Sequence, residues 1–259
     1  MTTFRLIARL DLKGPDVIKG IQLEGFRKVG SPKALAQKYS SQGADEIVLV
    51  DVVASLYDRK STYTLIEQIV NSIRIPLTVA GGVQNLSDAK ALFDAGADRV
   101  GLNTHAIRNP NLIGEIASIY GSQGVVCSIE AKRSELSNSG WECLTESGRQ
   151  RSEVDFTEWL GRQESLGAGE ILITSVDRDG TRSGVDIDEA KVAREVSNLP
   201  IIYSGGISTA DDVIEISNWR LSGVCIGASL HYDYLNFQNL KKEMIATGLS
   251  VRPTETMKL

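Results

Sequence analysis

The stretch Pro76-Leu77-Thr78-Val79-Ala80-Gly81-Gly82-Val83 decides the fold, because the chain contains a second copy of it. Pro200-Ile201-Ile202-Tyr203-Ser204-Gly205-Gly206-Ile207 has the same form and lies 124 positions later. Each copy consists of a proline, a short run suited to a buried strand, and a Gly-Gly turn whose backbone amides can approach a ligand closely. The pattern therefore predicts two equivalent strands, each followed by a phosphate-binding turn.

The same displacement persists on both sides of these two copies. Residues 43–50 match residues 167–174, and residues 100–104 match residues 224–228, again 124 positions apart. Three matches in one register indicate two similar halves, about 1–123 and 124–250. Because each half is long enough to hold several elements, we interpret the repeat as a duplicated half-domain and expect residues 1–259 to form a single domain.

Composition narrows the classes of protein that this chain can belong to. It has 259 residues, 42% of them hydrophobic, and a net charge of −5, which gives no basic footprint for nucleic acid. No apolar run approaches the roughly 20 residues that span a bilayer, and the N-terminus has no secretory signal pattern. The three cysteines are odd in number and unpatterned. We expect a cytoplasmic protein that binds neither nucleic acid nor a membrane.

Strands and helices are predicted to alternate along the whole chain. Strands are expected at 5–11, 46–51, the run before Gly81, 99–103, 124–130, 169–175, 201–204 and 224–227. Helices are expected to open near Ser31-Pro32, Ser61, Ser87-Asp88, Asn109-Pro110, Asp155, Asp186 or Asp188, Ser208 and Asn236. A polar loop is expected after the first strand, and a hairpin within 134–153. This alternation predicts a parallel sheet. A closed (β/α)8 TIM barrel built from two half-barrels fits it best, because the repeat argues against an open doubly wound sheet.

In such barrels the chemistry lies where the strands end. Asp11 and Glu130 end the first and fifth strands, which lie opposite each other in an eight-stranded barrel. Two facing carboxylates can divide the general acid and general base roles when their pKa values differ. The alternative is that both acids merely cap loops or contact Lys19. Other polar side chains expected at strand ends are Asp51, Asn103, Thr174, Asp179 and Ser204.

Two glycine-rich amide clusters are expected on opposite sides of the mouth. The first combines Gly81 and Gly82 with Asn103 and Thr104; the second combines Gly205 and Gly206 with Gly227, Ala228 and Ser229. A single Gly-Gly turn after a strand is often only a turn. The doubled arrangement favours a ligand with two phosphates.

Four charged residues stand near the starts of strands, at the opposite end of the predicted barrel. They are Arg5, Glu46, Arg99 and Glu170, of which Glu46 and Glu170 are repeat mates. They either face solvent or form a ring of paired charges across the barrel floor.

His105 and His231 belong to no cluster of metal ligands, and His231 is expected to pack in a loop. No metal site is expected.

Several motifs resemble those of one known family, the cyclase subunit of imidazole glycerol phosphate synthase. They include Leu10-Asp11-Leu12-Lys13-Gly14, Val17-Ile18-Lys19-Gly20, Gly43-Ala44-Asp45-Glu46, Ala131-Lys132-Arg133, residues 167–172 and Asp177-Arg178-Asp179-Gly180-Thr181. The likeness covers nearly the whole chain. It implies a (β/α)8 barrel that takes ammonia from a glutaminase subunit docked on its floor. The ammonia reacts with a bis-phosphorylated formimino ribonucleotide, which gives imidazole glycerol phosphate and aminoimidazole carboxamide ribotide.

The resemblance also implies roles for individual residues, with no cofactor. Asp11 and Glu130 would be catalytic, with Asp11 the principal general acid/base, and Arg5, Glu46, Arg99 and Glu170 would form the ammonia gate. The substrate would be bound by Lys19, Asp51, Gly81, Gly82, Asn103, Thr104, Thr174, Asp179, Gly180, Ser204, Gly205, Gly206, Gly227, Ala228 and Ser229.

Several departures from the family pattern support a second hypothesis. Glu130 stands where the family has aspartate, and Arg9 replaces a small residue beside Asp11. Ala80 replaces a glycine, and residues 217–222 replace a glycine-rich segment. The extra methylene of Glu130 moves the carboxylate by about an ångström, a shift that can cost roughly a hundredfold in rate. The chain is therefore either a cyclase or a paralogue that channels ammonia to a sugar-amidating partner in surface-polysaccharide synthesis.

Overall fold

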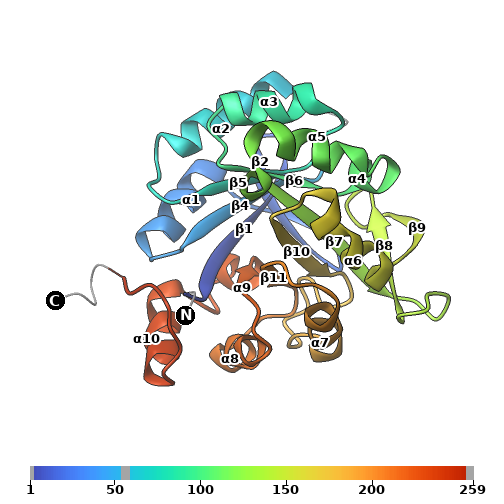
Figure 1. Cartoon of the computed structure of the whole chain (residues 1–259). Helices are drawn as coiled ribbons and strands as arrows, with labels where there is room; N and C mark the ends of the chain where they lie inside the picture. Colours follow the sequence, from blue (N-terminus) through green and yellow to red (C-terminus); the bar gives the residue numbers. More distant parts are fainter. Residues whose placement is uncertain (1–2, 54–58, 255–259) are drawn as a thin grey trace.

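A computed structural model describes residues 3–53 and 59–254, without the side chains of 59–61. Eight parallel strands form a closed barrel in the chain order β1, β4, β5, β6, β7, β10, β11 and β12, and β12 pairs with β1 (Figure 1). Their bounds are Arg5–Lys13, Glu46–Asp51, Leu77–Ala80, Arg99–Leu102, Val125–Arg133, Glu170–Ser175, Ile201–Ser204 and Gly223–Ile226. The predicted (β/α)8 barrel is confirmed, and the open sheet is wrong.

The first strand of each half continues into an antiparallel hairpin. In the second half, β8 (Trp141–Thr145) and β9 (Gln150–Asp155) form the predicted hairpin. In the first half, β2 (Asp16–Ile21) and β3 (Glu24–Gly30) form a hairpin where only a polar loop was expected. Most of β3 is exposed, so its sequence lacks the apolar alternation that identifies a half-buried strand. This hairpin carries Lys19 back over the mouth of the barrel.

Helices surround the barrel on its outside (Figure 1). The longer ones are α1 (Pro32–Ser41), α2 (Arg59–Val70), α3 (Leu86–Asp94), α5 (Asn111–Tyr120), α6 (Phe156–Leu166), α7 (Ile187–Val196), α8 (Ala210–Asn218) and α10 (Phe237–Ala246). Three short helical segments, α4 (Thr104–Arg108), η1 (Ser122–Gly124) and α9 (Ala228–His231), were not predicted. Within the described ranges, no helix is long and apolar enough to cross a membrane.

Helix starts follow the predicted caps with small shifts. Asp155 and Asp186 accept hydrogen bonds from first-turn amides of α6 and α7, as expected. Asn85 caps α3 in place of Ser87-Asp88, and Thr209 caps α8 in place of Ser208. In each of these two helices an aspartate lies three residues after the observed cap, which is the spacing of a capping box.

Apolar side chains fill the barrel from both sides of its strands. A cluster that includes Ile7, Val48, Val126, Leu172 and Ile202 lies inside the barrel. A larger cluster packs the outer strand faces against the helices. Because parallel strands buried on both faces read as continuous apolar runs, the strands were visible in the sequence. The apolar interior separates a charged floor from a charged mouth.

Candidate active site and charged floor

The four charged residues at the barrel floor are paired with one another. Arg99 Nη1 lies 2.8 Å from Glu46 Oε2 and 3.2 Å from Glu170 Oε2. Arg5 Nη1 lies 3.3 Å from the same Glu46 oxygen, and Arg5 also pairs with Glu170. Thr78 donates a 2.6 Å hydrogen bond to Glu46 Oε1. Burial raises the pKa of Glu46 despite the Arg99 charge. The residues form a ring of alternating charge, so the solvated alternative is wrong.

A buried ionic network lies at the mouth, where β1 ends. Lys19 Nζ lies 3.0 Å from Asp11 Oδ2, and 2.9 and 2.8 Å from the two carboxylate oxygens of Asp179. Arg9 Nε donates a 2.7 Å hydrogen bond to Asp11 Oδ1, and Arg9 Nη1 donates another of 2.7 Å to Thr174 Oγ1. Arg9, Asp11 and Lys19 are at most 2% exposed. The network thus brings together four predicted site residues and adds Arg9.

The network holds Asp11 and Lys19 in their charged forms. Burial alone would raise the pKa of Asp11, but the adjacent Arg9 and Lys19 charges outweigh it and hold that pKa well below its usual range. Burial alone would lower the pKa of Lys19, but Asp11 and Asp179 outweigh it and raise that pKa. Asp11 does contact Lys19, as one of the two sequence interpretations anticipated.

Glu130 differs from Asp11 in its surroundings. It comes from β7, is 5% exposed and lines a cavity of about 240 Å³. Its Oε2 atom has no hydrogen-bond partner among the described residues. Burial raises the pKa of Glu130 to about 7, although the Arg9 charge opposes the shift. Near neutral pH this side chain is therefore divided between its acidic and basic forms.

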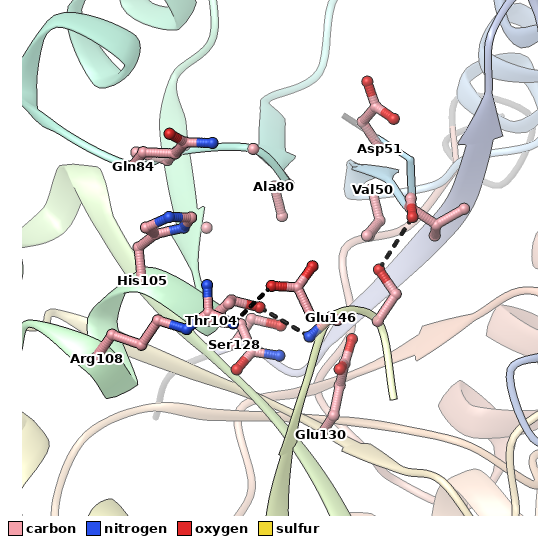
Figure 2. A pocket seen from close by; sticks show the side chains of 17 residues that line it. Val50, Asp51, Ala80, Gln84, Thr104, His105, Arg108, Ser128, Glu130 and Glu146 are labelled. Atoms are coloured by element: carbon pink, nitrogen blue, oxygen red, sulfur yellow. Dashed lines mark hydrogen bonds and ion pairs between the residues drawn. The ribbon is translucent and has the colours of Figure 1, made fainter. Parts of the chain in front are cut away.

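The first glycine cluster forms one wall of this cavity. Gly81, Gly82, Asn103 and Thr104 all line it, together with Asp51 (Figure 2). Gly81 has φ +98°, and a Cβ there would collide with the carbonyl oxygen of Asp51. Glycine at this position lets the turn lie against β4 and keeps its backbone open to the cavity.

The second glycine cluster lines a smaller cavity on the opposite side of the barrel. Its lining includes Asp179, Gly180, Ser204, Gly205, Gly206, Gly227 and Ala228. Gly206 has φ +79°, and a Cβ there would collide with the carbonyl oxygen of Gly184. The hydroxyl of Ser229 donates to the Ile207 carbonyl. A phosphate role for Ser229 would therefore use its backbone N–H.

The tip of the β8–β9 hairpin closes over the first cavity, which the sequence did not predict. The amide of Glu146 donates to Thr104 Oγ1 at 2.9 Å, and Arg108 Nη2 lies 2.9 Å from Glu146 Oε1 (Figure 2). Arg149 reaches the Val52 carbonyl at 2.8 Å. The cavity lining also includes Gln84, His105, Ser128 and Ser147. The available signal was the position of His105 and Arg108 directly after Asn103, which was predicted to end a strand at the mouth.

His231 is buried, but it lies in the short helix α9 (Ala228–His231) and not in the predicted loop. Its Nδ1 atom lies 2.8 Å from the hydroxyl of Tyr39. Burial lowers the pKa of His231 to about 4, so the ring is neutral at neutral pH.

Comparison with known proteins agrees with this geometry. The family model described as "Histidine biosynthesis protein" matches residues 5–236. The chain belongs to this histidine biosynthesis family. A relative from Legionella pneumophila named "Imidazole glycerol phosphate synthase subunit HisF" is 46% identical over 82% of this chain and 99% of the relative. Relatives of the same name from Thermobifida fusca and Pyrococcus furiosus are 39% and 38% identical over 96% and 97% of this chain, and 98% and 99% of their own lengths.

Membership of the histidine biosynthesis family confirms the resemblance to the cyclase subunit. The relatives are named as subunits, so this family includes parts of larger assemblies. Arg9 and Glu130 are two of the positions that we expect to depart from the family pattern, and in the structure Arg9 contacts Asp11 directly. Both lie in the mouth of the barrel, where the reaction of a TIM barrel takes place.

Proposed function

We propose that this protein is the ammonia-dependent cyclase subunit of an imidazole glycerol phosphate synthase. It converts the bis-phosphorylated formimino ribonucleotide to imidazole glycerol phosphate and aminoimidazole carboxamide ribotide. We place the reaction in the cytoplasm, where the buried free thiols of Cys127, Cys143 and Cys225 stay reduced.

One observation carries the proposal: two glycine turns face each other across a mouth that holds acid–base groups. β5 and β6 carry the first turn, and β11 and β12 lie half a barrel away with the second. Backbone amides near Gly81 and Gly206 suit a phosphate at each end of one substrate. Asp11 and Glu130 lie near the C-terminal ends of the opposite strands β1 and β7, which continue to Lys13 and Arg133. A long substrate held at both ends would present its centre to these carboxylates.

Ammonia would reach the mouth through the interior of the barrel. The charge ring of Arg5, Glu46, Arg99 and Glu170 forms the gate, and a glutaminase subunit docks on the floor around it. Beyond the ring the interior is lined by apolar side chains such as Ile7, Val48 and Leu172. Such a lining favours neutral ammonia over ammonium, because an unpaired cation is costly to bury.

The test is a turnover assay of the purified chain with the formimino ribonucleotide and an ammonium salt. Loss of substrate is followed by absorbance, and Glu130→Gln and Asp11→Asn serve as variants. Turnover by the wild-type chain that either variant abolishes, with substrate binding retained, supports the cyclase. Unchanged turnover in both variants would exclude these two carboxylates from a role in catalysis.

A second candidate function follows from Arg9 and Glu130. Arg9 occupies one oxygen of Asp11, and Glu130 stands where the family has aspartate. These features favour a paralogue that passes ammonia to a sugar-amidating partner in surface-polysaccharide synthesis. Absence of turnover, with the phosphate-bearing substrate still bound, would support this candidate. Both glycine clusters favour the cyclase, because a conduit needs no bis-phosphate site.

A further inference from the structure

Arg9 is a buried charged side chain inside the barrel to which the proposed reaction assigns no role. Alternate residues of β1 face inward: Arg5 joins the floor ring, Ile7 the inner apolar cluster and Asp11 the mouth network. Arg9 lies between Ile7 and Asp11 in this series and is 2% exposed. A guanidinium buried so completely requires close partners.

The partners of Arg9 hold it in one position. Its Nε atom donates to Asp11 Oδ1 at 2.7 Å, and its Nη1 atom donates to Thr174 Oγ1 at 2.7 Å. Lys19 Nζ contacts the other Asp11 oxygen at 3.0 Å. Each oxygen of Asp11 therefore accepts from a cation. Protonating Asp11 would leave these two buried cations with Asp179 as the one anion of the network, which is costly, so the contacts hold Asp11 in its ionised form.

The buried charges of the mouth balance without Glu130. Arg9 and Lys19 are the two cations of the network, and Asp11 and Asp179 are its two anions. Glu130 forms no ion pair with a described residue, and its Oε2 atom has no described hydrogen-bond partner. Glu130 lines the cavity beside the first glycine turn, whereas Asp11 is not among the described residues that line it.

We propose that Arg9 is a positioning residue that fixes Asp11 as a permanent anion and leaves Glu130 as the group that exchanges a proton with the substrate. This inference rests on the proposed cyclase function for its catalytic part. On this assignment Arg9 and Glu130 are complementary: the arginine removes one carboxylate from acid–base work, and the longer side chain brings the other to the cavity.

The charges around Glu130 set the direction of its pH dependence. Arg9, Asp11 and Asp179 act on it from across the barrel, and Lys19 is shared by these two aspartates. Asp51, His105, Arg108 and Glu146 surround the cavity. Burial outweighs the Arg9 charge, so the pKa of Glu130 is about 7. The acid form is lost as pH rises through 7, and kcat/KM per free NH3 falls with it. Asp11 contributes no acidic limb.

The decisive measurement is a pH titration of the side-chain carboxyl groups by ¹³C NMR in the free protein. Glu130→Gln and Asp11→Asn identify the two resonances. We expect the Glu130 carbon to titrate near pH 7, and the Asp11 carbon to remain ionised far below the usual Asp value of about 3.9. A Glu130 midpoint below about 5, or an Asp11 midpoint at or above its usual value, would overturn the inference.

Two substitutions of Arg9 separate positioning from mere packing. Arg9→Met should raise the Asp11 midpoint by about one pH unit or more, a tenfold change in its acid constant, and add an acidic limb to kcat/KM. Arg9→Lys retains the charge and should restore most of the wild-type titration. If Arg9→Met does not fold, the wild-type and Arg9→Lys titrations still decide the question.

The NMR readout does not depend on turnover. If the Asp11 and Glu130 carboxyl groups titrate as expected but the chain does not cyclise the substrate, the effect of Arg9 on Asp11 is supported and the proposed function is wrong. If the chain cyclises the substrate but its Asp11 titrates at the usual pKa of aspartate, the proposed function is supported and the proposed role of Arg9 is wrong.

Discussion

The Nζ atom of Lys19 lies 2.8 Å from Oδ2 of Asp179, and both side chains are buried at the mouth of the barrel. The same nitrogen neutralises Asp11. Removing it in Lys19→Met would leave two buried carboxylates with one remaining cation, Arg9. We expect the free energy of unfolding at pH 7 to fall by about 3–5 kcal/mol, because an uncompensated buried charge remains. Urea unfolding measures this change.

The chain supplies a matched control for Lys19. Lys90 and Asp94 form an ion pair of 2.6 Å on α3 in which both side chains are 62% exposed. Lys90→Met removes the same charge from a solvated pair and should leave the unfolding midpoint unchanged. If both variants lose the same free energy of unfolding, burial does not increase the contribution of Lys19 to stability.

The second glycine turn offers a test of phosphate binding. Gly206→Ala must move the turn, because φ is +79° and the new Cβ would collide with the Gly184 carbonyl. Displacing the turn by about an ångström should raise KM for the bis-phosphorylated substrate, by up to roughly 100-fold. Gly140→Ala is the control, since φ is +85° with open space around the site. This variant introduces the backbone strain of a positive φ without a steric collision, so steady-state kinetics should show an unchanged KM.

The barrel could be predicted from the sequence because its strands are buried on both faces and repeat at a fixed spacing. Ile201–Ser204, for example, is apolar up to its last residue and ends at a glycine turn. The hairpin after β1 gave no such signal, because β3 is exposed along most of its length and is held by pairing with β2. Pairing of exposed strands depends on the partner, and short-range patterns do not reveal the partner.

The candidate site was predictable where position along a strand determines which end of the barrel a residue occupies. Asp11, Thr174 and Ser204 were placed at the mouth because each was expected at the C-terminal end of a strand, where the chemistry of such barrels lies. The sequence did not reveal that Arg9 turns toward Asp11, or that Arg108 meets Glu146 across 38 positions. These contacts depend on rotamers and on the course of the β8–β9 hairpin, which lie outside any local pattern.

The charge ring at the floor predicts that glutamine-dependent turnover and ammonium-dependent turnover respond differently to the loss of Arg99. Arg99 contacts Glu46 and Glu170 at once, so Arg99→Met leaves the two glutamates with Arg5 as the remaining arginine of the ring. On the proposed function, glutamine-dependent turnover with the glutaminase subunit should fall several-fold. Turnover with ammonium salt should persist, because the mouth lies at the other end of the strands. Steady-state assays with each nitrogen source measure the two rates.

An exposed arginine outside the charge ring provides the control for Arg99. Arg162 packs on the ring of Trp159 from helix α6. Arg162→Met should leave both the glutamine-dependent and the ammonium-dependent rate unchanged. If Arg99→Met lowers the two rates by the same factor, the ring supports the fold of the barrel and has no part in admitting ammonia.

Glu189 predicts a pH dependence of stability that is independent of function. This glutamate lies on α7 and is fully buried, and Tyr203 donates a 2.9 Å hydrogen bond to its Oε2 atom. Burial raises the pKa of Glu189 to about 8. In the unfolded chain the pKa returns to about 4.3. Between these values the folded state binds the extra proton, so stability is fully present below about pH 4.3 and is lost as pH rises toward 8.

Glu189→Gln removes this titration and keeps an oxygen that can accept from Tyr203. The difference in unfolding free energy between variant and wild type should grow in favour of the variant by up to about 1.4 kcal/mol per pH unit across the window. Urea unfolding at pH 5, 6, 7 and 8 measures it, with the exposed Glu115→Gln on α5 as a control that should show no slope. A constant difference at all four pH values would mean that Glu189 is ionised throughout and that burial is offset by a partner.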